Sequence, residues 1–142
     1  MPYITIDRVT KSFGTFKALD LVSIGIQKGA IHAILGENGA GKSTLMNILY
    51  GLYQPDDGDI RIDGTPLHLN SPRDAIASGI GMIHQHFMLV ESLTVMENVI
   101  MGLVRGARTI DVAFHGQRIR EMSASFGFDL DPMAPIWTLP MG

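Results

Sequence analysis

The chain has 142 residues, a usual length for one domain, and its 46% apolar and 18% charged residues are typical of a globular rather than a disordered protein. The formal net charge of −3 argues against a nucleic-acid partner held by phosphate contacts, and it provides no polybasic patch for a membrane surface. The chain has no cysteine, which excludes disulfide bonds and thiolate catalysis, and no apolar run long enough to span a bilayer.

The first half of the chain has the pattern of a β-rich segment followed by one strand–helix unit. Residues 3–9 alternate between apolar and polar side chains and predict a strand, residues 11–16 predict a turn, and residues 18–26 predict a second strand. The short apolar run 30–35 predicts a buried parallel strand. An apolar stripe with helical spacing follows and predicts a helix; its members are Leu45, Ile48, Leu49 and Leu52.

The second half of the chain is predicted to be mostly helical. Residues 59–63 alternate and predict one more strand, and residues 80–83 predict another. Ser71 is the expected N-cap of a short helix that begins with proline. Thr94 begins a capping box that opens a second helix. Asp111 is the expected cap of a third helix, which runs to about residue 126 before a glycine.

The stretch GENGAGKST, residues 36–44, has the pattern of a phosphate-binding loop: glycine, four residues, glycine, lysine and serine. Its glycines allow backbone conformations in which successive N–H groups point at one anion. Lys42 would reach the β- and γ-phosphates, and Ser43 would offer its hydroxyl to Mg²⁺. The predicted nucleotide contacts in this loop are Asn38, Gly39, Ala40, Gly41, Lys42, Ser43 and Thr44.

The simplest alternative for this stretch is a glycine-rich turn between two core elements. The loop lies between a predicted strand and a predicted helix, which is the order that a phosphate-binding loop requires. Because Lys42 and Ser43 also stand at their required places, the phosphate-binding interpretation is favoured.

Several stretches together resemble the nucleotide-binding domain of ABC transporters. Residues 9–14, VTKSFG, resemble the segment whose aromatic residue stacks on adenine, which the resemblance assigns to Phe13. Residues 81–87, GMIHQHF, resemble the Q-loop, whose glutamine contacts Mg²⁺ and the attacking water; here that residue would be Gln85. Residues 94–99, TVMENV, resemble the segment after the Q-loop, near the surface that docks on membrane subunits.

The stretch GENGAGKSTLMNILYGLYQPDDGDIRIDG, residues 36–64, is similar to the ATP-binding subunits of bacterial importers for nucleosides and simple sugars. The resemblance implies an α/β fold of the P-loop NTPase class and ABC type, truncated, with an N-terminal antiparallel β portion, a P-loop βα unit and the start of a helical subdomain. It implies a partial ATP-binding core over residues 1–92. Residues 93–142 would then be the start of the helical subdomain, which ends in a signature-like segment at residues 139–142.

The same resemblance implies that the complete protein hydrolyses ATP to power uptake of a nucleoside or simple sugar. The implied cofactors are ATP and Mg²⁺, with Lys42 and Gln85 in catalysis and with Ser43 and Gln85 on the metal. The implied partners are transmembrane permease subunits, a second nucleotide-binding domain and, indirectly, an extracytoplasmic substrate-binding protein, with the chain at the cytoplasmic face of the cell membrane. The family's metal-binding aspartate, catalytic glutamate and switch histidine would follow Gly142, so little turnover is expected from these residues alone.

Two other functions stay open. The first is a different P-loop enzyme. A GTPase would need a guanine-reading Asn-Lys-x-Asp segment, which the 142 residues lack. A small-molecule kinase would use an arginine-rich lid, for which the candidates are Arg105, Arg108, Arg118 and Arg120. The second is a non-catalytic module that binds nucleotide or docks on membrane subunits.

Overall fold

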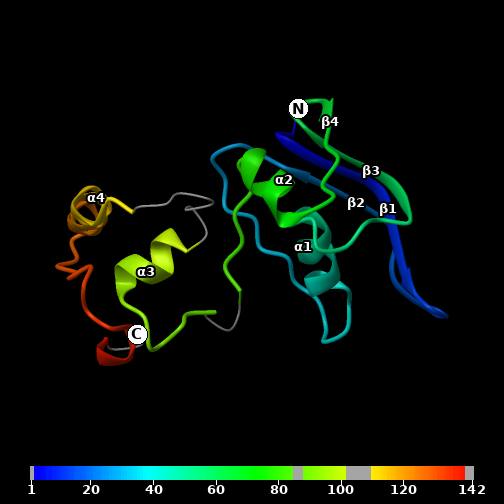
Figure 1. The fold of residues 1–142 in the computed structure, drawn as a ribbon. Coiled ribbons are helices and arrows are strands. Elements are labelled where there is room, and N and C mark those ends of the chain that lie inside the picture. The colour runs from blue at the N-terminus through cyan, green and yellow to red at the C-terminus, as the bar shows by residue number, and fades with distance from the viewer. Residues whose placement is uncertain (1, 85–87, 102–109, 140–142) are drawn as a thin grey trace. The chain divides into compact units, whose positions relative to one another are not determined.

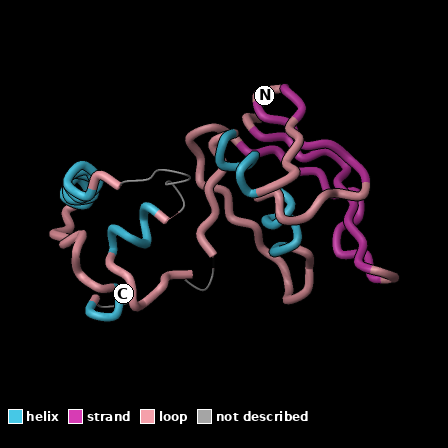
Figure 2. Tube along the Cα trace, viewed as in Figure 1, coloured by secondary structure: helices cyan, strands magenta, loops and turns pink. Residues whose placement is uncertain are grey.

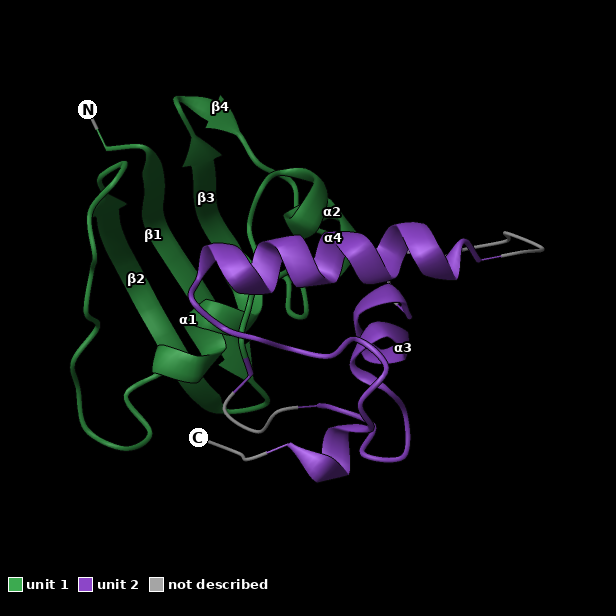
Figure 3. Ribbon diagram, turned by 90° about the vertical axis from the view of Figure 1, so that its left-hand side faces the viewer, with its two compact units in different colours: residues 1–83 green, residues 84–142 purple. Residues whose placement is uncertain are grey.

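The computed structural model describes residues 2–84, 88–101 and 110–139. The chain divides into two compact units, residues 1–83 and 84–142, which Figure 3 draws in different colours. The first unit contains a sheet and two helices, and helices dominate the described part of the second, as Figures 1 and 2 show. Within the described ranges, no helix is both long and apolar enough to cross a bilayer. The functional boundary predicted between residues 92 and 93 stays a prediction.

The first unit is built on a four-stranded antiparallel sheet in the order β2-β1-β3-β4. β1 (Ile4–Phe13) and β2 (Phe16–Ile26) form a long hairpin, and Gly14 helps to close its turn with a φ of 59°. β3 (Asp57–Ile62) pairs with the other edge of β1, and β4 (Thr65–Pro66) pairs with β3. The antiparallel β portion predicted from the sequence is therefore present.

The strands are longer than the sequence pattern predicts. The turn expected over residues 11–16 is shorter in the structure, because residues 11–13 continue to pair with β2. β3 begins at Asp57 rather than at residue 59, because Asp57 pairs with Thr10. In both places, cross-strand pairing extends a strand into residues that resemble a turn when considered alone.

Helix α1 (Lys42–Leu49) packs against this sheet and supplies part of its core. The predicted apolar stripe is confirmed within the helix, but Leu52 lies beyond the helix end and is exposed. The buried cluster comprises Ile6, Val9, Leu19, Leu45, Ile48, Leu49 and Ile60. Burial of this apolar face fixes α1, and with it the loop that precedes α1, on the sheet.

Two predicted strands, the parallel strand over residues 30–35 and the strand over residues 80–83, are not strands in the structure. A strand requires a neighbour that completes its ladder of hydrogen bonds, and neither segment has such a neighbour among the described residues. Ile31 and Leu35 are consequently exposed rather than buried. The chain still runs from this segment directly into the predicted phosphate loop.

The predicted helix starts are confirmed in both units. α2 (Pro72–Ala77) follows Ser71, which has an extended backbone at the N-cap. α3 (Val95–Ile100) begins with the predicted capping box: the Glu97 N–H donates to Thr94 Oγ1 at 3.2 Å, and the Thr94 N–H donates to Glu97 Oε2 at 2.8 Å. The pKa of the Glu97 carboxyl is lowered mainly by the hydrogen bond that it accepts from the Thr94 N–H, and also by the one from the Thr94 hydroxyl.

The remaining elements of the second unit pack around α3. α4 (Val112–Ser125) starts at the predicted cap, where Asp111 Oδ1 accepts a hydrogen bond from the Phe114 N–H at 2.9 Å. A short 3-10 helix, η1 (Ile136–Thr138), lies near the end of the described chain. The segment before η1 accepts hydrogen bonds from the first N–H groups of α3, at Pro132 O and Ala134 O, and so satisfies the N-terminus of that helix.

Candidate functional site

The predicted phosphate loop leads directly into α1. Lys42 is the first residue of that helix, and its Nζ donates to the carbonyl oxygens of Gly36 and Glu37, each at 2.7 Å. The ammonium group therefore folds back over the loop instead of extending into solvent. A phosphate bound by this loop would meet a positive charge that is already in place.

Glycine supplies two backbone conformations that this loop requires. Gly39 and Gly41 both have a φ of 86°, which side chains disfavour. At Gly41, a Cβ would lie 2.4 Å from Ala18 O and 2.8 Å from a methyl group of Leu19, whereas at Gly39 nothing lies within 4 Å. The absence of a side chain at Gly41 lets the loop lie directly against β2, and this contact places the predicted phosphate site beside the sheet.

Backbone N–H groups at the start of α1 are available to an anion. The first hydrogen bond at this end of the helix joins the Leu45 N–H to Gly41 O at 2.9 Å, so the N–H groups of residues 42–44 have no intrahelical acceptor. Among the described residues, no side chain caps this helix. Free N–H groups, the positive end of a helix and the Lys42 ammonium together form an anion-binding arrangement.

Phe13 lies at the tip of the β1–β2 hairpin, whose strand β2 contacts the loop at Gly41. Two residues before Phe13, Lys11 pairs with Leu19, and Leu19 is one of the residues against Gly41. Phe13 is 42% exposed, so part of this residue is open to a ligand. An aromatic ring at this place can stack on a flat base.

Two residues that sequence reasoning did not assign to the site contact the Phe13 ring. Tyr53 meets it in an edge-to-face arrangement, with ring centroids 5.3 Å apart and an interplanar angle of 72°. Lys11 Nζ lies over the ring, 5.7 Å from its centroid. The sequence offers no local signal for the Tyr53 contact, because that contact depends on how the hairpin meets the turn after α1, whereas Lys11 stands two residues before Phe13 on the same strand.

Asp56 forms hydrogen bonds to Lys11 and Ser12 of β1, next to Phe13. Its Oδ1 accepts a hydrogen bond from Lys11 Nζ at 2.7 Å, and its Oδ2 accepts one from the Ser12 N–H at 2.7 Å. The pKa of the Asp56 carboxyl is lowered mainly by the hydrogen bond from Lys11, and also by the one from the Ser12 N–H. From the sequence, Pro55-Asp56-Asp57-Gly58 predicts only a turn, and nothing in this stretch indicates a contact with β1.

Part of the predicted site lies outside the described residues. This applies to Gln85, the proposed glutamine of the Q-loop, and to residues 140–142 of the signature-like segment. The described residues bring together the phosphate loop, Lys42 and the hairpin that carries Phe13, whereas the role of Gln85 stays a prediction.

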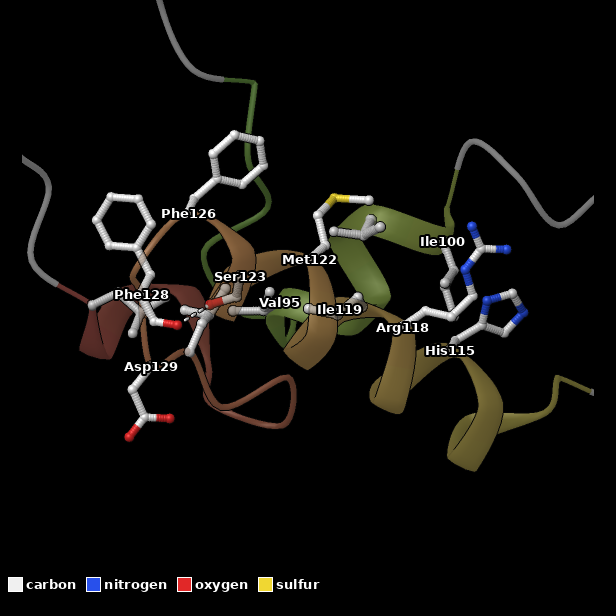
Figure 4. A pocket seen from close by; sticks show the side chains of 13 residues that line it. Val95, Ile100, His115, Arg118, Ile119, Met122, Ser123, Phe126, Phe128 and Asp129 are labelled. Atoms are coloured by element: carbon white, nitrogen blue, oxygen red, sulfur yellow. Dashed lines mark hydrogen bonds between the residues drawn. The ribbon is translucent and has the colours of Figure 1, made fainter.

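The second unit contains a separate cavity of about 810 Å³ between α3 and α4 (Figure 4). Apolar side chains from both helices form most of its wall, while His115 and Arg118 lie together in one part of it and Asp129 in another. The Ser123 hydroxyl donates to Phe128 O at 2.7 Å and is therefore already satisfied. The described lining has no loop of free N–H groups, so the phosphate loop remains the better candidate for a nucleotide site.

Comparison with known sequences finds similarity to the ATP-binding proteins of import systems. The profile of the family described as "ABC transporter" matches residues 19–134. The glucose import ATP-binding protein TsgD13 of Haloferax volcanii is 41% identical, over 99% of this chain and 31% of that protein. The guanosine import ATP-binding protein NupO of Bacillus subtilis is 47% identical, over 94% of this chain and 26% of that protein. The chain therefore spans less than a third of the length of these relatives.

Solved structures share the fold. The ADP conformation of MJ1267, described as an ATP-binding cassette of an ABC transporter, has a TM-score of 0.85 at 24% identity, over 99% of this chain and 60% of that chain. A nucleotide-free ATP-binding cassette from an ABC transporter has a TM-score of 0.80 at 25% identity, with the same coverage of both chains. The predicted fold, a P-loop α/β fold of this type, is thereby confirmed.

Proposed function

Since this chain belongs to the ABC transporter family, we propose that it forms part of the ATP-binding subunit of an import system. The observation that carries the proposal is the arrangement at Lys42. Its Nζ lies 2.7 Å from the carbonyl oxygens of Gly36 and Glu37, at the start of a helix whose first N–H groups have no acceptor among the described residues. Catalysis of phosphoryl transfer depends mainly on positioning and charge compensation, and this arrangement supplies both for a triphosphate.

Each part of the proposed nucleotide site has a distinct task. The loop N–H groups bind phosphate oxygens, Lys42 compensates the charge of the β- and γ-phosphates, and Phe13 stacks on adenine. The family resemblance supports Gln85 as the residue that orients the attacking water. The proposed nucleotide contacts are Phe13, Asn38, Gly39, Ala40, Gly41, Lys42, Ser43 and Thr44.

Ser43 fits the role of a Mg²⁺ ligand. Its side chain is exposed on the first turn of α1, and its hydroxyl has no hydrogen-bond partner among the described residues. A hydroxyl oxygen is a donor of the kind that Mg²⁺ prefers. When bound, Mg²⁺ would neutralise negative charge that develops on the phosphates. The ligands proposed from this chain are Ser43 and, from the family resemblance, Gln85.

The proposed cargo of the complete protein is a nucleoside or a simple sugar. This part of the proposal is supported by relatives whose names state glucose import, guanosine import and nucleoside import. We expect transmembrane permease subunits and a second nucleotide-binding domain as direct partners, and an extracytoplasmic substrate-binding protein as an indirect one. The expected location is the cytoplasmic face of the membrane, with residues 1–92 in the ATP-binding core and 93–142 at the start of the helical subdomain.

Release of inorganic phosphate from ATP by the full-length protein tests the proposal. We expect Mg²⁺-dependent release that Lys42→Ala abolishes. Lys28→Ala is the matched control, because Lys28 is also a cation of the first unit but its Nζ lies over the Tyr3 ring, 5.4 Å from the centroid. Transfer of phosphate to a small molecule instead of water would support the kinase alternative. Nucleotide binding without any phosphate release would support the non-catalytic module.

A further inference from the structure

β1 loses its β3 neighbour before it reaches Phe13. The last pair between these strands joins Thr10 to Asp57, the first residue of β3. Residues 11–13 still pair with β2 on one side. On the other side, no strand continues alongside them within the described part of the chain. The hairpin tip that carries Phe13 therefore needs another source of support on that side.

Asp56 takes the place of the missing strand. Its N–H donates to Thr10 O at 2.9 Å. Its carboxylate accepts from the Ser12 N–H and from Lys11 Nζ, both at 2.7 Å. The bond to Ser12 resembles a ladder hydrogen bond in which a charged carboxylate replaces the strand carbonyl. One residue thus holds three consecutive residues of β1 immediately before Phe13.

The groups that Asp56 holds also hold the aromatic ring. The Lys11 ammonium, bound by Asp56, lies 5.7 Å from the Phe13 ring centroid and so occupies one face of the ring. Tyr53, from the same turn as Asp56, contacts the ring with centroids 5.3 Å apart. The ring is therefore contacted by Lys11 and by Tyr53, while Phe13 remains 42% exposed, which leaves part of it open to a base.

Helix α1 connects this turn to the phosphate loop. It begins at Lys42 in the loop and ends at Leu49, shortly before Tyr53 and Asp56. Its buried face is packed on the sheet. Phosphates bound at the start of α1 and a base stacked at the hairpin tip are therefore held from the two ends of one rigid element. A nucleotide can satisfy both contacts only if the spacing between them is correct.

We propose that Asp56 is a positioning residue for nucleotide binding, which acts through Lys11 and Ser12 to hold the Phe13 ring at a fixed spacing from the phosphate loop. The inference rests on the proposed function, since it requires Phe13 to be the surface on which the base stacks. Asp56 itself touches no substrate in this scheme. Its loss should weaken recognition of the base and leave recognition of the phosphates intact.

Equilibrium binding of ATP and of inorganic tripolyphosphate to the full-length protein tests the inference. Loss of a stacked aromatic in Phe13→Ala should weaken ATP binding by about fivefold or more. Asp56→Ala should cause part of the loss seen in Phe13→Ala and weaken ATP binding by about threefold or more. The affinity for tripolyphosphate should be unchanged. In the double variant, Asp56→Ala should add nothing to Phe13→Ala, because Asp56 acts through the ring.

Asp20→Ala is the matched control. Asp20 Oδ1 accepts a hydrogen bond from Lys17 Nζ at 3.1 Å on the same hairpin, so this variant also breaks an aspartate–lysine pair. Unlike Asp56, among the described residues Asp20 forms no side-chain hydrogen bond to the backbone of β1. It should leave both affinities unchanged. Asp56→Asn keeps an acceptor for the Ser12 N–H but loses the charge that binds Lys11, and its ATP affinity should be intermediate. It provides the same test if Asp56→Ala does not fold.

Three results would overturn the inference while the proposed function stands. They are ATP affinities of the Asp56 variants equal to that of the parent protein, fully additive losses in the double variant, and equal weakening of ATP and tripolyphosphate binding. The last result would make Asp56 a residue of general folding only. A parent protein that binds no ATP would overturn the proposed function itself, and the inference with it.

Discussion

Replacing Gly41 with alanine tests how the phosphate loop is built. Gly41 has a φ of 86°, in the left-handed region where a side chain costs about 1–2 kcal/mol. The new Cβ would also lie 2.4 Å from Ala18 O and 2.8 Å from a Leu19 methyl group, and the carbonyl is backbone that cannot rotate away. Overpacking of this kind costs about 1–3 kcal/mol. We expect Gly41→Ala to lower the free energy of unfolding by about 2–5 kcal/mol, the sum of the two contributions.

Gly39→Ala separates the two contributions. Gly39 has the same φ of 86°, but nothing lies within 4 Å of its Cβ position, so this change should cost only the conformational part, about 1–2 kcal/mol. Urea unfolding of the full-length variants, followed by circular dichroism, measures both changes. If Gly41→Ala proves no more destabilising than Gly39→Ala, the loop does not lie against β2, and the described construction of the site is refuted.

Three further variants test other parts of the structure. Lys42→Ala should weaken ATP binding in the presence of Mg²⁺ by at least about tenfold, because a hydrogen bond to a charged group contributes roughly 1.5–3 kcal/mol; equal titration curves would argue against the phosphate site. Ile48→Ala should destabilise the protein by about 2–5 kcal/mol, since Ile48 is only 1% exposed in the core cluster, and urea unfolding that shows a negligible loss would contradict this packing. The pKa of Glu97 is lowered by the hydrogen bonds from Thr94, so their stabilisation is complete above the ordinary glutamate pKa of about 4.3 and is lost as pH falls through the lower folded-state value. Glu97→Gln should therefore unfold at a lower temperature than the parent protein near neutral pH, with a gap that closes in acid; a gap independent of pH would refute this origin.

Features that depend on neighbouring residues could be predicted from the sequence. Lys42 and the loop glycines act within one nine-residue stretch, residues 36–44. Thr94 bonds to a residue three positions later, and Asp111 does the same. Each of these signals contains both partners within one turn of the chain, so no knowledge of the tertiary fold is needed to recognise it.

Features that depend on distant partners could not be predicted. Asp56 binds Lys11 and Ser12, which are 45 and 44 residues away, although its own surroundings indicate only a turn. The run 30–35 has the composition of a buried strand, but a strand depends on its neighbours, and the described residues provide none. The aromatic character of Phe13 is evident from the sequence, but its contact with Tyr53, which lies beyond α1, is not.

Titration of the full-length protein with ATP, with and without Mg²⁺, tests most directly the central claim that this chain binds ATP through its phosphate loop. We expect saturable binding with a dissociation constant below about 1 mM, the usual range for enzyme substrates. Binding should be stronger with Mg²⁺, should be displaced by tripolyphosphate, and should be weakened by Lys42→Ala. No binding at that concentration, or binding that Lys42→Ala leaves unchanged, would contradict the claim.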